Sequence, residues 1–291
     1  MKTLIVTGAA NGIGRATVEM AIQQGYFVIG ADKDADGLKV LQRIYSDAVF
    51  EAQVADFSDM AVIKTFIPKL YERHATIYGL VNNAGLYHCK SVYGYSDEQI
   101  DEILNVNLKA LVYLSKYFAE REMRHEAPRS IVNIASVAGE VGSCDALYGA
   151  TKAAVIGMTK ANAWNFAPFV RVNVVSPALI HETAIYDTIP QYRRAEYARQ
   201  EILKDPILPS GVAEVILLLV GDAMRHITGR VIPVDNGAYP RLASRCARKN
   251  CCWWAPATCA CRSSRSWGRK TRSSSWCWAV MKTRPFGCAT W

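Results

Sequence analysis

The stretch Thr7-Gly8-Ala9-Ala10-Asn11-Gly12-Ile13-Gly14 joins a β-rich segment to a segment with helical spacing. Residues 2–7 favour a strand, and apolar side chains recur with the helical period through residues 13–24. A glycine-rich turn between a strand and a helix lets backbone N–H groups approach a pyrophosphate. The stretch therefore predicts a dinucleotide-binding unit, with a plain strand-to-helix turn as the alternative. The residues expected to contact the cofactor here are Gly8, Asn11, Gly12, Ile13 and Gly14.

Asp32 lies at the end of the second predicted strand, residues 26–31, and 18 residues after Gly14. A carboxylate at this place accepts the adenosine ribose hydroxyls and repels a 2′-phosphate. The glycine-rich loop contains no cation to neutralise such a phosphate, although Lys33 is able to turn toward one. The sequence therefore predicts NAD as the cofactor in preference to NADP.

Strand and helix patterns alternate along the chain as far as residue 235. Further strands are expected at residues 48–55, 77–81, 130–135, 170–175 and 230–235, and helices at 58–72, 96–114, 146–164 and 212–220. Such alternation packs helices on both faces of a parallel sheet. It predicts an α/β fold with a Rossmann-like, doubly wound parallel sheet of about seven strands.

Two groups of residues that follow strands are expected to contact the cofactor. Asp56 follows the third strand, where its carboxylate is placed to meet the adenine amino group. The fourth strand ends in Asn82-Asn83-Ala84-Gly85, whose small and amide side chains allow a turn under a cofactor; an ordinary Asn-Gly-type turn is the alternative. The contacts expected from these groups are Asp56, Asn83, Ala84 and Gly85.

The stretch Tyr148-Gly149-Ala150-Thr151-Lys152 carries the strongest sign of chemistry. Helical spacing places the phenol and the ammonium on one face, and of the fourteen Tyr only Tyr148 has a Lys four residues later. A nearby positive charge favours the phenolate, so we expect a lowered pKa for Tyr148 and proton exchange with an alcohol or carbonyl oxygen. Ser136 ends the fifth strand, where open α/β sheets place ligand sites. Asn107 lies among apolar neighbours and is either a structural strut or the holder of an active-site water.

Together these residues resemble the short-chain dehydrogenase/reductase family over roughly residues 1–241. The matching positions, in family order, are Thr7-Gly8-x-x-x-Gly12-x-Gly14, Asp56, Asn82-Asn83-Ala84-Gly85, Asn107, Ser136, Tyr148-x-x-x-Lys152, Pro177 and Thr183. The resemblance implies one Rossmann-type catalytic domain that forms a homotetramer or homodimer and needs no catalytic metal. The chain departs from the family at Ala178, where the family usually has Gly after the Pro. An Ala is tolerated there unless φ is positive.

The resemblance also implies a role for each matching position. Tyr148 is the acid/base, and Lys152 lowers its pKa and binds the nicotinamide ribose. Ser136 holds the substrate oxygen, and Asn107 positions a relay water. Pro177, Ile180 and Thr183 complete the cofactor site, where Ile180 and Thr183 fix the carboxamide.

The composition changes sharply after residue 241. Residues 242–291 hold seven of the nine Cys, six of the seven Trp and ten basic residues, with no Asp or Glu. Residues 1–241 have 24 basic and 26 acidic side chains, so the net charge of +8 belongs to the tail and does not indicate a nucleic-acid-binding domain. We interpret the tail as irregular and non-catalytic; a zinc module or a nucleic-acid-binding segment is the alternative. Two Cys in residues 1–241 and no long apolar run favour a soluble cytoplasmic protein with no membrane partner.

The sequence thus predicts an NAD-dependent oxidoreductase that interconverts a secondary alcohol and its ketone. Segments 86–95, 140–147 and 183–206 are expected to choose the substrate. The aromatic residues of the first and third favour a cyclic or aromatic alcohol or diol, although such residues are equally suited to packing. Arg193 and Arg194 either bind a substrate carboxylate or belong to a solvated helix face. The alternatives are a 3-oxoacyl-thioester (acyl-carrier-protein) reductase that uses NADPH, and a cofactor-binding scaffold whose tail binds nucleic acid.

Overall fold

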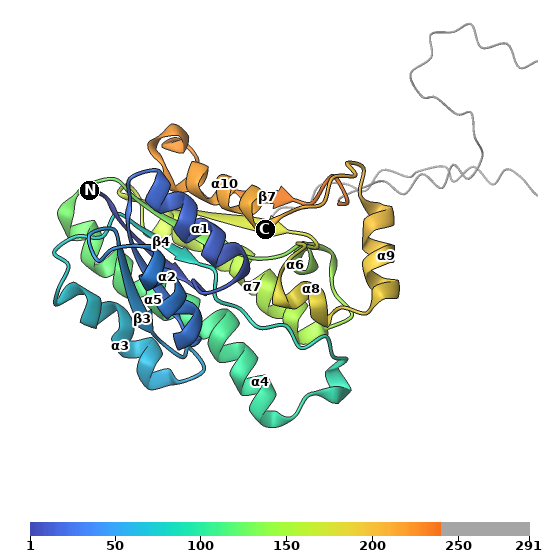
Figure 1. Cartoon of the computed structure of the whole chain (residues 1–291). Helices are drawn as coiled ribbons and strands as arrows, with labels where there is room; N and C mark the ends of the chain where they lie inside the picture. The colour runs from blue at the N-terminus through green and yellow to red at the C-terminus, as the bar shows by residue number, and fades with distance from the viewer. Residues whose placement is uncertain (240–291) are drawn as a thin grey trace, which may run out of the picture. The chain divides into compact units, whose positions relative to one another are not determined.

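The computed structural model describes residues 1–239, which contain a seven-stranded parallel sheet. The strands are β1 (Thr3–Thr7), β2 (Phe27–Asp32), β3 (Phe50–Val54), β4 (Gly79–Asn82), β5 (Arg129–Ile134), β6 (Val170–Pro177) and β7 (Val231–Val234). Their order across the sheet is β3-β2-β1-β4-β5-β6-β7. This order confirms the predicted doubly wound α/β fold (Figure 1).

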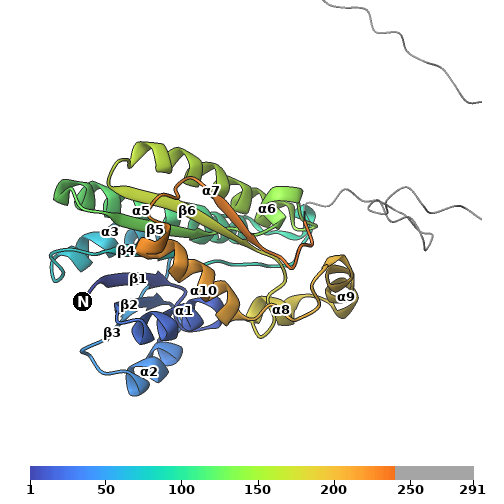
Figure 2. The ribbon, with the colours of Figure 1, turned by 90° about the horizontal axis from the view of Figure 1, so that it is seen from above.

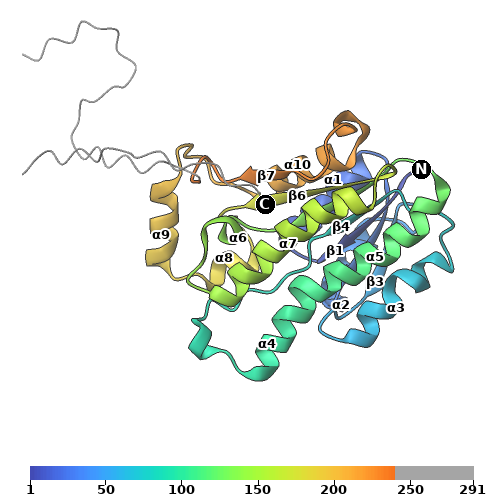
Figure 3. The ribbon, with the colours of Figure 1, turned by 180° about the vertical axis from the view of Figure 1, so that it is seen from behind.

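Helices cover both faces of the sheet, as Figure 2 shows from above and Figure 3 from behind. One face carries α1 (Gly12–Gln23), α2 (Ala35–Ile44) and α10 (Pro209–Val220), and the other carries α3 (Met60–Tyr71), α5 (Ala110–Glu122) and α7 (Ala146–Asn165). Because both faces are covered, successive side chains of one strand enter different apolar clusters. In β1, Leu4 and Val6 pack into one cluster and Ile5 into the other, and all three are fully buried.

The long helix predicted for residues 96–114 is interrupted. The capping box at its start is confirmed, since Ser96 Oγ accepts from Gln99 N and Gln99 Oε1 accepts from Ser96 N. After α4 (Asp97–Leu104), however, residues 105–109 form a π-helical turn before α5 begins. A π-turn inserts one extra residue into the helix and is frequent at functional sites. It carries Asn107, and apolar periodicity alone cannot reveal it.

The chain reverses its direction of travel across the sheet at β1. This strand pairs with β2 on one side and with β4 on the other, because the chain first winds outward to β3 and then returns. In open α/β sheets, ligands bind outside the carboxyl ends of the strands at such a switch point. The short helices α6 (Ala138–Val141), α8 (Ala184–Thr188) and α9 (Gln191–Gln200) belong to segments that follow β5 and β6 and help to surround this place.

No helix within residues 1–239 has the combination of length and apolar character that crossing a bilayer requires. The predicted tail, residues 242–291, lies outside the described residues.

Candidate active site

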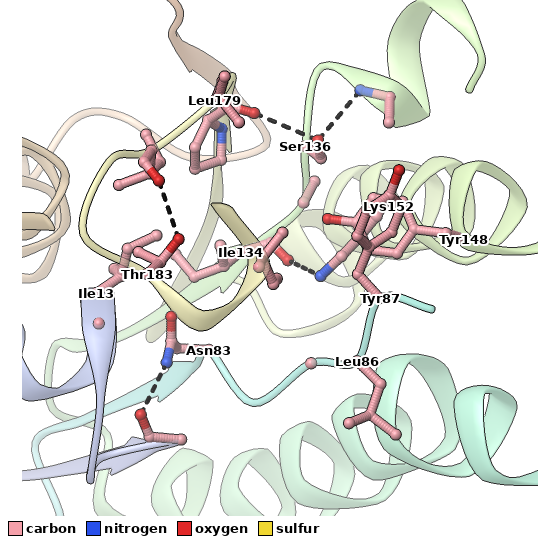
Figure 4. Close-up of a pocket in the computed structure, with 18 of the residues that line it drawn as sticks. Ile13, Asn83, Leu86, Tyr87, Ile134, Ser136, Tyr148, Lys152, Leu179 and Thr183 are labelled. Atoms are coloured by element: carbon pink, nitrogen blue, oxygen red, sulfur yellow. Dashed lines mark hydrogen bonds between the residues drawn. The ribbon is translucent and has the colours of Figure 1, made fainter. Parts of the chain in front are cut away.

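A cleft of about 400 Å³ lies at the carboxyl ends of the strands. It gathers nearly every residue that the sequence predicts to be functional, from segments far apart in the chain. The predicted residues that line it are Gly8, Asn11, Gly12, Ile13, Asp32, Asp56, Asn83, Ala84, Gly85, Ser136, Tyr148, Lys152, Pro177, Ile180 and Thr183. Figure 4 shows ten labelled lining residues around this space, from Ile13 and Thr183 on one side to Tyr148 and Tyr87 on the other.

Gly14 and Asn107 are the two predicted residues that do not line this cleft. A Cβ on Gly14 would lie 1.8 Å from the carbonyl oxygen of Gly8, so the close packing of the first turn of α1 on the loop requires glycine. Gly12 has a φ of +53°, and a Cβ there would lie 3.3 Å from Thr183 Cγ2. The glycines therefore leave a narrow space bounded by bare backbone, which fits a pyrophosphate.

The glycine-rich loop is fastened to the turn after β4 by side-chain hydrogen bonds. Asn83 Nδ2 donates to Thr7 O at 2.9 Å and to Gly8 O at 3.2 Å. In return, Thr7 Oγ1 accepts from the backbone N–H groups of Asn83 and Ala84, both at 3.0 Å. The two segments that would hold a dinucleotide thus move as one unit. The sequence shows Thr7 as part of the glycine-rich motif but assigns it no contact. In the structure its buried hydroxyl is the acceptor that joins this loop to the turn after β4.

Asp32 lines the end of the cleft where it was predicted to select the cofactor, and Asp34 lies just behind this lining, in hydrogen-bond contact with Asp32 and Asn11. Asp32 Oδ2 accepts from Ala10 N at 3.0 Å, and its Oδ1 accepts from Asp34 N at 3.0 Å. Asp34 caps α2 by accepting from Gly37 N, and its other oxygen accepts from Asn11 Nδ2 at 3.1 Å. The Gly37 N–H, followed by the Asn11 amide, lowers the pKa of Asp34 and keeps it ionised. Sequence reasoning missed Asp34, although its N-cap position before α2 was a readable signal.

Asp56 lies at the same end of the cleft and is also held as an anion. The Ser58 N–H, which donates to Asp56 Oδ1 at 2.9 Å, is the main cause that lowers the pKa of this carboxyl. The ammonium of Lys33 adds a smaller effect in the same direction. Lys33 therefore has an acidic neighbour in Asp56, which competes with any 2′-phosphate for its charge.

The opposite wall of the cleft brings together Ser136, Tyr148 and Lys152 (Figure 4). Lys152 Nζ lies 5.6 Å from the centre of the Tyr148 ring and donates to Ile134 O at 2.9 Å. Ser136 Oγ donates to Pro177 O at 3.3 Å and accepts from Ala138 N at 3.2 Å. The Tyr87 and Tyr148 rings pack in a T-shaped arrangement, with 4.7 Å between ring centres. A phenol, a hydroxyl and an ammonium therefore surround one space in which a substrate oxygen fits.

Comparison with known proteins shows to which family a chain with this site belongs. The sequence model of the family described as enoyl-(acyl carrier protein) reductase matches residues 8–239. The 3-oxoacyl-(acyl-carrier-protein) reductase FabG of Thermotoga maritima is 34% identical over 240 residues, which cover 81% of this chain and 97% of the relative. The protein belongs to the short-chain dehydrogenase/reductase family. It is an oxidoreductase of an NAD(P)-dependent family that acts on CH–OH or keto groups.

Solved structures of short-chain dehydrogenases agree with this assignment. A protein from Brucella melitensis described as a short-chain dehydrogenase/reductase of the glucose/ribitol dehydrogenase type has a TM-score of 0.74 at 33% identity. The match covers 82% of this chain and 97% of that one. A 4-hydroxyisoleucine dehydrogenase complexed with NADH has a TM-score of 0.76 at 29% identity, over 82% of this chain and 99% of that one. The family's nicotinamide-cofactor binding thus fits the glycine-lined cleft described above.

The pKa of Tyr148 differs from the sequence prediction. Burial of the phenol raises the pKa to about 12, the Ser136 hydroxyl opposes this rise, and the Asp145 carboxylate adds to it. Burial also lowers the pKa of Lys152 from 10.5 to about 8, because the ammonium loses its hydration. The prediction of a lowered pKa for Tyr148 is therefore wrong for the protein alone, because burial is the largest effect on the phenol. Sequence spacing indicates that two groups are close but not how much water they lose.

The buried Lys152 leads to a stability prediction. The pKa of Lys152 is about 8 in the folded protein and 10.5 for an ordinary, solvated Lys. Between these pH values the unfolded chain therefore binds more protons than the folded protein. Burying the charged ammonium destabilises the folded state. This destabilisation is fully present below pH 8 and disappears as pH rises to 10.5, so the free energy of unfolding should rise across this window. In Lys152→Met this contribution, at most roughly 3 kcal/mol, should be absent.

Urea unfolding at several pH values tests this expectation. The matched control is Lys160→Met, which removes an exposed Lys from the same helix and should keep the wild-type pH dependence. If the free energy of unfolding changed with pH by the same amount in wild type, Lys152→Met and Lys160→Met, the expectation would be contradicted.

Asn107 acts as a strut between the π-turn and the segment after β4. Its Oδ1 accepts from Leu86 N at 2.7 Å, and its Nδ2 donates to Leu86 O at 2.9 Å and to Thr151 Oγ1 at 3.2 Å. Asn107 and Lys152 also line a separate small cavity of about 10 Å³, close to the size that one water needs. Asn107 is therefore a structural strut, which is one of the two roles that the sequence left open. The other role, holding an active-site water, is implied by the resemblance and remains a proposal.

The remaining sequence predictions concern the segments around the cleft. Ala178 is not among the described non-glycine residues with positive φ, so this departure from the family is tolerated without backbone strain. Arg193 and Arg194 do not line the cleft. Arg193 Nη1 donates to the thiol of Cys144, and Arg194 Nε donates to Ile189 O at 2.7 Å. Within residues 1–239, neither Arg is placed as a carboxylate clamp of the main cleft.

Proposed function

We propose that the protein is an NAD-dependent oxidoreductase that interconverts a secondary alcohol and its ketone, with Tyr148 as the acid/base. The observation that carries the proposal is the convergence of Ser136, Tyr148 and Lys152 on one wall of a cleft whose far end is lined by Asp32, with Asp34 bonded to the lining residue Asn11. Asp32 and Asp34 there support NAD, since both would repel a 2′-phosphate.

The roles of the chain's own residues follow from their positions. In oxidation, Tyr148 takes the hydroxyl proton of the alcohol, and in ketone reduction it returns a proton to the carbonyl oxygen. Ser136 turns its hydroxyl from Pro177 O toward the substrate oxygen and fixes it beside Tyr148. Lys152 would hold the nicotinamide ribose of a bound cofactor through its ammonium, and its positive charge would favour the phenolate. Bound NAD+ supplies the hydride acceptor and a positive ring that further favours the phenolate.

The substrate end of the cleft supports a compact, largely apolar alcohol or ketone. Aliphatic and aromatic side chains predominate among the residues that line it beyond the predicted set. They include Tyr87, Val141, Leu179, Ile185, Ile189 and Tyr197. Such a lining suits a cyclic or aromatic alcohol or diol, because apolar rings gain from burial while one oxygen meets Ser136 and Tyr148.

A second candidate is a 3-oxoacyl-thioester reductase that uses NADPH. It is favoured by the names of the curated relatives, among them the 3-oxoacyl-(acyl-carrier-protein) reductase FabG of Escherichia coli, which is 31% identical over 247 residues. The match covers 82% of this chain and 97% of that relative. Asp32 and Asp34 speak against it, since an NADPH enzyme must accommodate a phosphate where these carboxylates lie.

A substrate panel distinguishes the two candidates. Purified protein is assayed with secondary alcohols, cyclic diols and 3-hydroxyacyl thioesters, and in reverse with ketones and 3-oxoacyl thioesters. We expect the alcohols and ketones to give the larger kcat/KM. Preference for the thioesters would overturn the first candidate, and dinucleotide binding without turnover of any substrate would favour the scaffold alternative.

We also propose that residues 1–241 carry the whole activity and act in the cytoplasm as a homotetramer or homodimer. The family match ends at residue 239, and the curated relatives are covered almost completely without the tail. A chain that ends at Arg241 should therefore keep its kcat/KM and its oligomeric state by light scattering. The control is the full chain measured in the same buffer. A loss of activity or of assembly in the shortened chain would show that residues 242–291 contribute.

A further inference from the structure

The segment of residues 86–95 crosses from β4 toward α4 beside the cleft and is called here the substrate loop. We propose that Asp145 is a positioning residue that, through Tyr95, fastens the substrate loop to the first turn of α7 and so fixes where Tyr148 stands. The effect on turnover rests on the proposed function, whereas the fastening itself does not.

Asp145 joins the two segments with its two carboxylate oxygens. Its Oδ1 accepts from Tyr148 N at 3.0 Å, as the N-cap of α7. The hydroxyl of Tyr95 lies 2.9 Å from Oδ1 and 2.7 Å from Oδ2. The backbone N–H of Lys90 donates to Oδ2 at 3.3 Å. One side chain therefore holds the helix that carries the acid/base and two points of the substrate loop.

Capping alone does not account for this carboxylate. A neutral Ser or Asn satisfies a helix N-terminus, whereas Asp145 places a charge where its residue has no exposed surface. Among the described residues no cation lies within ion-pair distance of it, and the nearby Lys90 ammonium donates instead to Gln99 Oε1 at 2.8 Å. Tyr95 supplies the one side-chain donor that the described part of the chain offers to this charge. The hydroxyl of Tyr95 thus acts together with the backbone N–H groups of Tyr148 and Lys90 to stabilise the buried charge.

The substrate loop is clamped at both ends, and the residue between the clamps touches the acid/base. Asn107 holds Leu86 through both of its backbone groups. Asp145 holds residues 90 and 95, as described above. Tyr87 lies between these points, and its ring packs against that of Tyr148 in a T-shaped arrangement (Figure 4). Loosening the Asp145 clamp should therefore disturb the substrate wall that Tyr87 forms and leave the distant dinucleotide end unchanged.

The charge of Asp145 also acts on Tyr148 directly. The groups that face Tyr148 are Ser136 from the end of β5, Lys152 from α7, Tyr87 from the substrate loop, and Asp145. Burial is the main cause that raises the pKa of Tyr148, the Ser136 hydroxyl lowers it, and the Asp145 carboxylate raises it further. Removal of that negative charge should lower the pKa of Tyr148. Since alcohol oxidation needs the phenolate, its rate should then rise at lower pH than in wild type.

Two variants separate the clamp from the charge. Tyr95→Phe removes one hydroxyl and keeps the ring; its control is Tyr93→Phe, a 95% exposed Tyr of the same loop. Asp145→Asn keeps an oxygen that can cap α7 but removes the charge; its control is Asp59→Asn, the equivalent cap at the start of α3. Tyr95→Phe should raise the KM for the alcohol about three- to tenfold with little change in the KM for NAD+. Asp145→Asn should shift the pH profile of kcat to lower pH, and both controls should match wild type.

Hydrogen exchange measured by mass spectrometry tests the clamp without any substrate. Tyr95→Phe should exchange faster than wild type in residues 86–95 and in the first turn of α7, whereas Tyr93→Phe should not. This readout remains decisive if no alcohol is turned over, which would count against the proposed function alone. Exchange in Tyr95→Phe equal to that in Tyr93→Phe would overturn the proposal. So would an unchanged alcohol KM in Tyr95→Phe together with a wild-type pH profile in Asp145→Asn.

Discussion

Replacement of Tyr148 by Phe is expected to lower kcat for alcohol oxidation by about a hundredfold to ten thousandfold. The substitution removes the phenol that lies on the same wall of the cleft as Ser136 and Lys152. The ring remains, so its packing against Tyr87 and the shape of the cleft should persist. NAD+ affinity should change little, since the glycine-rich loop, Asp32 and Asn83 are untouched.

Initial rates of NADH formation and NAD+ titration by calorimetry measure the two expectations separately. Tyr93→Phe is the matched control, because it removes a phenol that is 95% exposed. A Tyr148→Phe variant that retains a tenth or more of the wild-type kcat would show that another group moves the proton. Loss of NAD+ binding in that variant would instead show that the substitution damages the site as a whole.

Neutralising Asp32 and Asp34 is expected to change the cofactor preference. Asp32→Asn and Asp34→Asn keep oxygens that can accept from Ala10 N and Gly37 N while they remove the charges. Each should move the ratio of kcat/KM for NAD+ over NADP+ about tenfold toward NADP+, which corresponds to about 1.4 kcal/mol. The double variant should shift this ratio further than either single variant, because Asp34 is bonded to Asp32 and to the lining residue Asn11 and adds a second negative charge at this end of the cleft.

The control for these variants is Asp36→Asn, which removes an exposed carboxylate from the same helix. It should keep the wild-type ratio. An unchanged ratio in the double variant would mean that the carboxylates do not meet the ribose, and that Lys33 or another group decides the preference.

The fold and most of the site are predictable because they depend on short-range patterns. The glycine-rich turn, the strand that ends at Asp32 and the helix that carries Tyr148 each follow from local spacing, and a parallel sheet brings strand ends to one edge. For this reason the sequence predicts that residues as distant as Gly8 and Ser136 share one site, and both line the cleft.

What the sequence did not reveal depends on burial and on contacts between loops. The π-turn around Asn107 needs tertiary support, and apolar periodicity continues through it. The pKa of Tyr148 depends on how much water the phenol loses, which spacing with Lys152 does not report. The bond between Tyr95 and Asp145 joins residues 50 positions apart in two loops without a periodic pattern.

The most direct test is the turnover of the wild-type protein with NAD+ and NADP+ in parallel on a secondary alcohol, beside Tyr148→Phe. We expect NADH formation with NAD+, at least tenfold lower kcat/KM with NADP+, and a kcat at least about a hundredfold lower in the variant. Preference for NADP+, or undiminished turnover by Tyr148→Phe, would contradict the account of this site.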